Sequence, residues 1–168
     1  MRIYLIGFMG AGKTHTGKIL SKKLNIPFFD LDDLIESNEQ KTIPEIFDLE
    51  GEEYFRTVER DLLHEVTEAK EAMVLSCGGG APCFFNNIDY MNQNGITLWI
   101  DTPYDVLLGR LRAGKNKRPL LRDLTDDQLK AYILKKSADR RIFYERAKLK
   151  LDQKETTIDE IIKTLTNE

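Results

Sequence analysis

Short apolar runs alternate along this chain with longer amphipathic stretches. The apolar runs predict five strands: Ile3–Ile6, Pro27–Phe29, Met73–Ser76, Thr97–Ile100 and Lys148–Leu151. The stretches between them are long enough for helices, and this alternation is typical of βαβ units. The sequence therefore predicts an α/β fold in which a parallel sheet is covered by helices on its faces.

Four threonines mark expected helix starts: Thr42, Thr102, Thr125 and Thr157. At three of them, a Glu or Gln three residues later completes a capping box. Thr102 is followed by a proline, which suits the first turn of a helix, so we expect a start there by the same logic. The helix after Thr125 should end at about Arg146.

The composition narrows the class of protein. A length of 168 residues fits one domain, taken here as residues 1–168. The net charge of −3 gives no global positive field for nucleic acid, and no apolar run approaches the roughly 20 residues that span a bilayer. The start is too short and too soon interrupted for a signal peptide. The two cysteines, Cys77 and Cys83, fit reduced packing thiols better than a redox pair or a zinc site. We therefore expect a cytoplasmic protein.

The strongest chemical signal is the segment from Gly7 to Thr14, which matches G-x-x-x-x-G-K-[ST]. Glycines let the backbone turn and approach phosphate oxygens, and successive N–H groups then form a nest for anions at a helix N-terminus. The motif predicts a phosphate cradle made by the backbone of Gly10, Ala11 and Gly12. Lys13 should face solvent in the empty protein and reach the β- and γ-phosphates, and Thr14 should bind Mg²⁺. A chance glycine-rich turn is the alternative, but the preceding strand and following helical spacing argue against it.

Two carboxylates, Asp30 and Asp32, follow the second predicted strand. Ligands of a parallel sheet bind beyond the carboxyl ends of its strands, and side chains two apart on a strand share a face. A kinase needs one carboxylate near Mg²⁺ and another to orient the acceptor hydroxyl. A solvated turn with a helix N-cap is the alternative, and Asp33 fits that simpler role.

Further candidates lie in the middle and late parts of the chain. Arg56 lies one helical turn from Glu59, so the pair is either a surface ion pair or a guanidinium aimed at a substrate carboxylate. The run Gly78–Gly80 closes the third strand, where three glycines suit close contact between a ligand and the main chain. Arg140 could supply a second guanidinium.

The segment from Arg112 to Arg122 carries five basic residues around a glycine and a proline. It has no clear hydrophobic period. A solvated surface loop is the simpler interpretation of such a charge run, and a basic loop that covers phosphates is the functional one.

Taken together, these motifs resemble shikimate kinases over almost the whole chain. The motifs that carry the resemblance, in family order, are the glycine loop, Asp30-x-Asp32, Phe55-Arg56-x-x-Glu59, Gly78–Gly80, Lys117-Arg118-Pro119-Leu120-Leu121 and Arg140-x-x-x-Tyr144. The resemblance implies a three-layer P-loop fold of nucleoside-monophosphate-kinase type, with a five-stranded parallel sheet, a substrate subregion and a lid at about 112–123.

The resemblance also implies roles for individual residues. Those assigned to shikimate are Asp32, Arg56, Gly78, Gly79, Gly80 and Arg140, with the two arginines on its carboxylate. Those assigned to ATP are Gly10, Ala11, Gly12, Lys13, Thr14, His15, Arg110, Arg118 and Gln153. Thr14 and Asp30 are assigned to Mg²⁺, and Lys13, Asp32 and Arg118 to the chemical step.

Some of these assignments rest on looser matches. Arg110 resembles an adenine-stacking arginine, and Gln153 with Lys154 falls where the adenine loop is expected. His15 stands where the family commonly has Ser or Thr, and an exposed first-turn residue is the better interpretation of it. Cys77 and the run Ala81–Cys83 are unusual around the glycines.

The implied activity is transfer of the γ-phosphoryl group of ATP to the 3-hydroxyl of shikimate, in aromatic amino-acid biosynthesis. A gluconate-type sugar-acid kinase is the rival enzyme, since it also needs arginine for a carboxylate. A non-catalytic nucleotide-dependent binding module is the rival of another class. No coiled-coil pattern is present, and a monomer with no nucleic-acid or membrane partner is the expectation.

Overall fold

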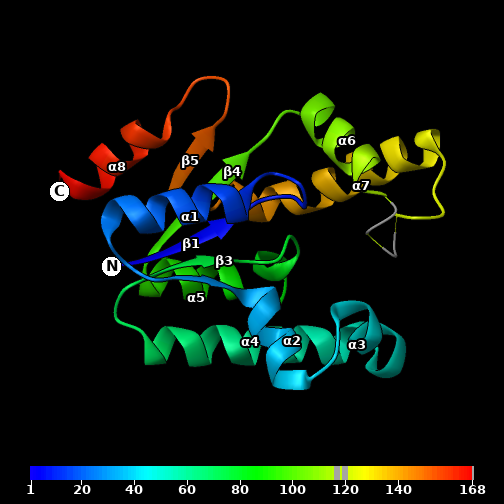
Figure 1. Cartoon of the computed structure of the whole chain (residues 1–168), viewed down its shortest axis with the longest axis horizontal. Coiled ribbons are helices and arrows are strands. Elements are labelled where there is room, and N and C mark those ends of the chain that lie inside the picture. Colours follow the sequence, from blue (N-terminus) through cyan, green and yellow to red (C-terminus); the bar gives the residue numbers. More distant parts are fainter. Residues whose placement is uncertain (116–117, 119–120, 168) are drawn as a thin grey trace.

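The computed structural model describes residues 1–115, 118 and 121–167, and it is organised around one parallel sheet (Figure 1). The strands are β1 (Arg2–Ile6), β2 (Phe28–Asp30), β3 (Met73–Ser76), β4 (Ile96–Asp101) and β5 (Leu149–Asp152). Their order in the sheet is β2-β3-β1-β4-β5, and every pairing is parallel. The predicted fold class is confirmed, and the strand bounds differ from the predicted ones by no more than one residue at either end.

The helices follow or precede the strands in βαβ order. They are α1 (Lys13–Leu24), α2 (Leu31–Glu39), α3 (Ile43–Glu50), α4 (Glu52–Ala69), α5 (Asn87–Asn94), α6 (Tyr104–Ala113), α7 (Asp126–Tyr144) and α8 (Ile158–Thr166), with a short 3₁₀ helix η1 (Ala81–Cys83). The helix after Thr125 ends two residues before the expected Arg146.

The expected helix caps are only partly confirmed. Thr125 and Thr157 each form a complete capping box. Thr42 also accepts from the Glu45 N–H, but the Glu45 carboxylate accepts from the Thr42 hydroxyl. The helix start predicted at Thr102-Pro103 is confirmed, because α6 begins at Tyr104 with Pro103 as its N-cap, but no side chain caps it. The Thr102 hydroxyl instead donates a hydrogen bond to the Ala11 carbonyl, in the loop between β1 and α1.

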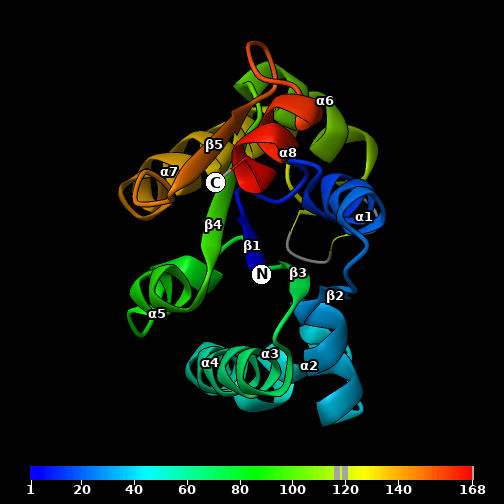
Figure 2. The ribbon, with the colours of Figure 1, turned by 90° about the vertical axis from the view of Figure 1, so that its left-hand side faces the viewer.

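Alternation along the strands divides the core into two halves. Tyr4 and Ile6 of β1 pack into a cluster with α4 and α5, whereas Ile3 and Leu5 pack into a second cluster with α1 and α8. Side chains two apart on a strand share a face, so the sheet has helices on both faces. Figure 2 shows this layering, with α1 on one side of β1 and β3 and with α4 and α5 on the other. The three-layer arrangement follows from this pattern.

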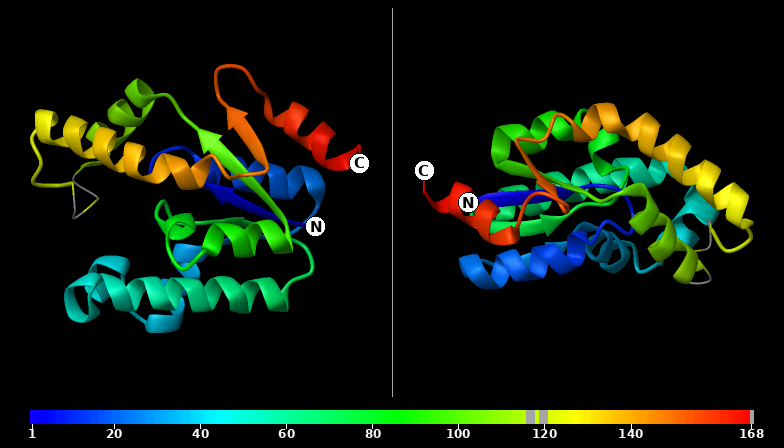
Figure 3. Two further views of the ribbon diagram at one scale, coloured as in Figure 1. Left: turned by 180° about the vertical axis from the view of Figure 1, so that it is seen from behind. Right: turned by 90° about the horizontal axis from the view of Figure 1, so that it is seen from above.

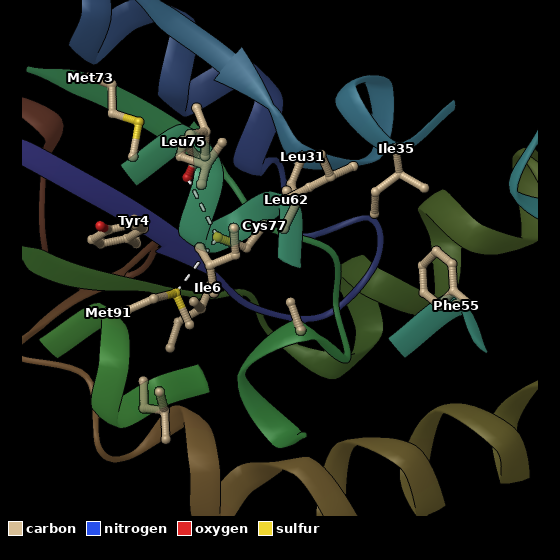
Figure 4. Close-up of a cluster of buried hydrophobic side chains, with 14 of the residues drawn as sticks. Tyr4, Ile6, Leu31, Ile35, Phe55, Leu62, Met73, Leu75, Cys77 and Met91 are labelled. Atoms are coloured by element: carbon tan, nitrogen blue, oxygen red, sulfur yellow. Dashed lines mark hydrogen bonds between the residues drawn. The ribbon is translucent and has the colours of Figure 1, made fainter. Parts of the chain in front are cut away.

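The cluster on the α4 side encloses one of the cysteines (Figure 4). Cys77 is 1% exposed, and its sulfur lies 3.8 Å from the Leu75 carbonyl oxygen and from the Met91 sulfur. Both Cys77 and Cys83 are free thiols. Cys77 is a packing residue, as expected.

All five strands point to one end of the molecule, where the β1–α1 loop emerges (Figure 1). Helix α3, the C-terminal end of α6 and the N-terminal end of α7 lie toward the same end of the molecule, and Figure 3 shows the same arrangement. The carboxyl ends of parallel strands are where this class of fold binds ligands. The fold therefore gathers the predicted site residues at one end.

Candidate active site

The β1–α1 loop has the backbone that its glycines allow. Gly7, Gly10 and Gly12 have φ values of 148°, 79° and 95°, which L-residues rarely adopt. At Gly7 a Cβ would also lie 2.7 Å from the Ile100 carbonyl oxygen. Only glycine satisfies both conditions there, and the loop leads directly into the N-terminus of α1.

Side chains from distant segments hold the carbonyl groups of this loop. The Ala11 carbonyl accepts from Thr102 Oγ1 at 2.9 Å and from Gln153 Nε2 at 3.0 Å, and the Gly10 carbonyl accepts from Arg110 Nη1 at 2.9 Å. Once the carbonyls are fixed by these donors, the peptide planes are fixed as well. The tethers therefore keep the loop in the shape that a phosphate nest needs.

The Lys13 ammonium is folded back onto the loop, and the side chain is half-buried rather than fully facing solvent as expected. Its Nζ donates to the Gly7 carbonyl at 2.6 Å and to the Phe8 carbonyl at 3.0 Å. Burial lowers the pKa of Lys13 to about 8, although the charge of Asp32 opposes the shift. The lysine is held at the mouth of the cradle by weak neutral acceptors, which an anion would outcompete.

A cleft of about 840 Å³ opens over the loop. Its lining includes most residues predicted to bind ATP or Mg²⁺: Gly10, Gly12, Lys13, Thr14, His15, Asp30, Arg110, Arg118 and Gln153. It also includes Asp32, Gly78 and Gly79 from the predicted acceptor site. The structure thus brings most of the predicted nucleotide residues and half of the predicted acceptor residues to one cleft, whose volume is in the range for small ligands. Arg56, Gly80 and Arg140 are outside its lining.

The two carboxylates reach the cleft differently from the prediction. Asp30 ends β2, but Asp32 lies in the first turn of α2, so the argument that both share one face of a strand is wrong. Asp30 caps α2 by accepting the Asp32 N–H at 2.9 Å, and its other oxygen accepts from Thr14 Oγ1 at 3.2 Å. Asp30, rather than Asp33, is the N-cap. The capping turn places the Asp32 carboxylate beside the cradle.

Burial, and next the negative charge of Asp30, raise the pKa of Asp32 to about 6, and Lys13 opposes that shift. A carboxylate with a pKa near 6 is ionised at neutral pH and still basic enough to take a proton from a hydroxyl that is being phosphorylated.

The glycine turn after β3 is the meeting point of the acceptor residues. A Cβ on Gly78 would lie 3.2 Å from an Asp32 oxygen, and one on Gly79 would lie 3.0 Å from Arg140 Nη1. A Cβ on Gly80 would lie 2.6 Å from Arg56 Nη2. Each glycine therefore allows close approach of a charged side chain to the main chain, and the three glycines bring two carboxylates, Asp32 and Glu59, and two guanidinium groups around a short turn.

Arg56 is a buried guanidinium with several partners. It is 8% exposed, and its Nη1 donates to Glu59 Oε1 at 2.9 Å. Glu59 is fully buried, and burial raises its pKa to about 7 although Arg56 lowers it. The surface ion pair considered from the sequence is therefore excluded. Figure 4 shows the neighbouring Phe55 at the edge of the hydrophobic cluster.

Arg140 approaches the turn from α7. Its Nη1 is buried and has no hydrogen-bond partner among the residues that the structure describes, and its guanidinium lies 5.6 Å from the centre of the Phe8 ring. One turn later, Tyr144 donates to the Gly79 carbonyl at 2.6 Å. A buried donor without a partner is costly, so an anion at this position would satisfy it.

Two further predicted residues lie at the cleft, and others fall outside the described part of the chain. Arg118 and His15 are exposed and line it. Lys117, Pro119 and Leu120 of the basic segment lie outside the described residues. Among the residues that the structure describes, no group of three or more His, Cys, Asp or Glu side chains forms a metal site.

Sequence reasoning missed several residues that shape the site. Thr102 tethers the phosphate loop, but it resembles a helix cap in the sequence. Asn87 is fully buried and donates to the Ala81 carbonyl at 2.9 Å, and Phe84 lies against Arg56. The unusual residues that follow the three glycines were the only signal for this second group.

Comparisons with known proteins agree with this site. The family model described as shikimate kinase matches residues 9–168. A shikimate kinase from Bacteroides thetaiotaomicron is 48% identical over 147 residues, which cover 88% of this chain and 83% of that protein.

Two solved structures are similar over nearly the whole chain. The 1.7 Å crystal structure of shikimate kinase from Bacteroides thetaiotaomicron has a TM-score of 0.90 at 43% identity, covering 99% of this chain and 97% of that one. Shikimate kinase from Acinetobacter baumannii in complex with shikimate has a TM-score of 0.86 at 34% identity, covering 99% and 93%. Within the described part of the chain, no helix has the length and apolar character needed to cross a membrane. From the family match and these identities, the chain is a kinase and belongs to the shikimate kinase family.

Proposed function

We propose that the cleft transfers the γ-phosphoryl group of ATP to the 3-hydroxyl of shikimate. One observation carries the proposal: the glycine turn 78–80 brings Asp32, Arg56 and Arg140 together beside the phosphate loop. A phosphate cradle that adjoins a carboxylate and two guanidinium groups suits an acceptor with one hydroxyl to phosphorylate and one carboxylate to bind. Family membership points to the same acceptor.

The phosphate loop supplies the nucleotide half of the site. The N–H groups of Gly10 to Thr14 and the N-terminus of α1 would hold the phosphates. Lys13 would leave its two carbonyl acceptors for the β- and γ-phosphates, because charge-assisted hydrogen bonds are stronger than neutral ones. Arg118 would add charge from the lid, the segment at about 112–123, and Arg110, Gln153 and His15 would lie along the nucleotide.

The residues present also fit Mg²⁺. The ion usually keeps several waters and takes few protein ligands besides phosphate oxygens. Thr14 and Asp30, which are hydrogen-bonded at 3.2 Å, would hold it directly or through water. Mg²⁺ would neutralise charge on the phosphates during transfer.

The acceptor half binds one anion and activates one hydroxyl. Arg140 Nη1, which lacks a partner among the described residues, and the fork of Arg56 would bind the shikimate carboxylate. The acceptor oxygen then attacks the γ-phosphorus, the bond to the bridging oxygen breaks, and ADP leaves. Asp32 takes the proton from the hydroxyl as the new bond forms.

The same proposal includes a monomer that works in a reducing compartment. Two observations support it: both cysteines are free thiols, and the sequence has no coiled-coil pattern. Size-exclusion chromatography with light scattering tests the monomer, and a mass of about 39 kDa, twice that of the 19.4 kDa chain, would contradict it.

An acceptor panel tests the function. ADP release is followed with shikimate, gluconate and nucleoside monophosphates, each with MgATP. We expect turnover with shikimate alone, and a loss of at least about 100-fold in kcat for Asp32→Asn with nearly unchanged ATP binding. Faster turnover with gluconate, or with a nucleoside monophosphate, would overturn the assignment. Asp33→Asn, which changes a carboxylate outside the cleft, is the matched control.

A further inference from the structure

The Arg56 guanidinium is enclosed between an aromatic ring and the glycine turn. The Phe84 ring centre lies 4.2 Å from Arg56 Cζ, within the range of a strong cation–π contact. Gly80 touches the same group, since a Cβ there would lie 2.6 to 2.9 Å from three guanidinium atoms. Phe55 lies further away, at 5.1 Å. Phe84 is therefore the nearest aromatic contact of the guanidinium.

The backbone that carries Phe84 is strained and firmly held. Phe85 and Asn86 follow it with φ values of 51° and 55°, and consecutive left-handed non-glycine residues are rare. Asn87 is fully buried, and its side chain holds the Ala81 carbonyl at 2.9 Å. Such strain persists only where the surroundings enforce it, and it is concentrated at functional positions.

A ring contact restricts Arg56 without using its N–H donors. Glu59 takes one donor of Nη1 at 2.9 Å, and Glu52 lies 3.4 Å from Nε. A polar side chain in the place of Phe84 would take a further donor. The ring instead fixes the plane of the guanidinium, and it leaves the other donors for a ligand. Holding the fork in advance reduces the entropy lost when a carboxylate binds.

We propose that Phe84 is a positioning residue for acceptor recognition, which acts by holding Arg56 in the plane that reads the acceptor carboxylate. This inference rests on the proposed function, because the carboxylate is that of shikimate. The alternative is that Phe84 only fills space in the turn after η1. That role would affect folding stability and leave the recognition of the carboxylate unchanged.

The chain offers a matched control in the next residue. Phe85 is also a phenylalanine on the strained turn, it is 49% exposed, and its ring lies 4.7 Å from the guanidinium of Arg60. Arg60 lies outside the proposed site. Phe84→Leu and Phe85→Leu therefore each remove one aromatic ring from one arginine, and only the first removes it from Arg56.

The test measures KM for shikimate, KM for ATP, kcat, and the ratio of kcat/KM for shikimate to that for its neutral carboxamide. Phe84→Leu should raise KM for shikimate about 3- to 30-fold and lower the acid-to-amide ratio by a similar factor. KM for ATP should stay within about twofold. Phe84→Tyr, which keeps the ring, should restore both quantities, and Phe85→Leu should change neither.

Three results would overturn the inference: equal effects of Phe84→Leu and Phe85→Leu, an unchanged acid-to-amide ratio in Phe84→Leu, or a loss that Phe84→Tyr does not restore. Urea unfolding of each variant separates a stability effect from these readouts. The wild type decides the proposed function separately. If it does not phosphorylate shikimate, that proposal fails; if it does and Phe84→Leu behaves like wild type, only the role of Phe84 fails.

Discussion

Replacing Gly80 by alanine should impair acceptor binding while leaving the fold intact. Gly80 has φ −92° and ψ −8°, so alanine fits its backbone without strain. The added Cβ would lie 2.6 Å from Arg56 Nη2 and 2.8 Å from Nη1. The guanidinium would have to withdraw by roughly 1 Å to reach an ordinary contact distance.

That displacement sets the size of the effect. A shift of roughly 1 Å is enough to lose one charge-assisted hydrogen bond to the acceptor carboxylate, a loss of about 1.5–3 kcal/mol. The affinity for shikimate should fall about 10- to 150-fold. The group that moves is a side-chain end rather than backbone, and although Glu59 and Phe84 contact it, the free energy of unfolding should fall by no more than about 1–2 kcal/mol.

Two other glycines give matched comparisons. At Gly17 a Cβ would lie 2.5 Å from the Phe28 ring and 2.9 Å from Leu5, so alanine should cost about 1–3 kcal/mol of stability through overpacking. At Gly109 in α6 nothing lies within 4 Å, so alanine should be neutral or stabilise the helix by up to about 1 kcal/mol. Neither change should alter KM for shikimate.

Isothermal titration with shikimate and urea unfolding, applied to the three alanine variants, measure both effects. The expected pattern is lost binding at position 80, lost stability at position 17 and no loss at position 109. The reasoning would be refuted if Gly80→Ala bound shikimate like wild type. It would also be refuted if its loss of binding came with a loss of stability as large as that of Gly17→Ala.

Three further predictions concern other parts of the site. Thr102→Val removes a donor to the Ala11 carbonyl, so KM for ATP should rise about 3- to 10-fold with little change in KM for shikimate. Thr102→Ser should restore the wild-type KM for ATP. Steady-state kinetics test this prediction, and an equal rise in both KM values would contradict it. The pKa values of Asp32 and Glu59 are raised above 3.8 and 4.5 to about 6 and about 7, so the unfolded chain releases protons first and the stability of the ligand-free protein should fall as pH rises from about 4 to 7. Urea unfolding at pH 5 and pH 7.5 measures that fall, which Glu59→Gln should reduce; a stability that rises over this range in the wild type would show that other groups dominate. Arg118→Ala should lower kcat at least about 100-fold with shikimate binding unchanged, and a titration that shows weakened shikimate binding would place Arg118 in the acceptor site instead.

The sequence predicted the sheet because the hydrophobic pattern and the glycine motif indicate the same fold. Ile3–Ile6 is apolar throughout, as a strand covered on both faces must be, and the glycine loop that follows can serve few other purposes. The five strands and the cleft over the loop are confirmed. The carboxyl ends of parallel strands meet at one end of a sheet, so the sequence alone predicts that residues far apart in the chain lie together there.

Local patterns failed where tertiary contacts decide the use of a side chain. Thr102 has the sequence of a helix cap, yet its hydroxyl binds the Ala11 carbonyl 91 residues away. The sequence predicts Asp32 on a strand because two carboxylates at i and i+2 fit a strand, whereas in the structure Asp30 ends the strand by capping α2. Capping and strand continuation compete at such an aspartate, and the sequence does not show which one is used.

The environment of Arg56 could not be predicted from the sequence, for a different reason. Its ion pair with Glu59 is local and was predicted, but its contacts with Gly80 and Phe84 depend on how the turn after β3 packs against α4. Phe85 and Asn86 have left-handed φ values although neither is a glycine, so the sequence does not indicate this backbone. In the sequence, only the unusual run Ala81–Cys83 after the three glycines marks this turn.

The central claim is that this cleft moves a phosphoryl group from ATP to the 3-hydroxyl of shikimate, with Asp32 as the proton acceptor. ³¹P and ¹H NMR of the reaction mixture test it most directly, because they identify both the product and the position of the phosphate. The wild type with MgATP and shikimate should give ADP and one phosphomonoester coupled to the proton on C3, and Asp32→Asn should give almost none in the same time. Inorganic phosphate as the main product, a phosphate on another hydroxyl, or full activity of Asp32→Asn would contradict the account.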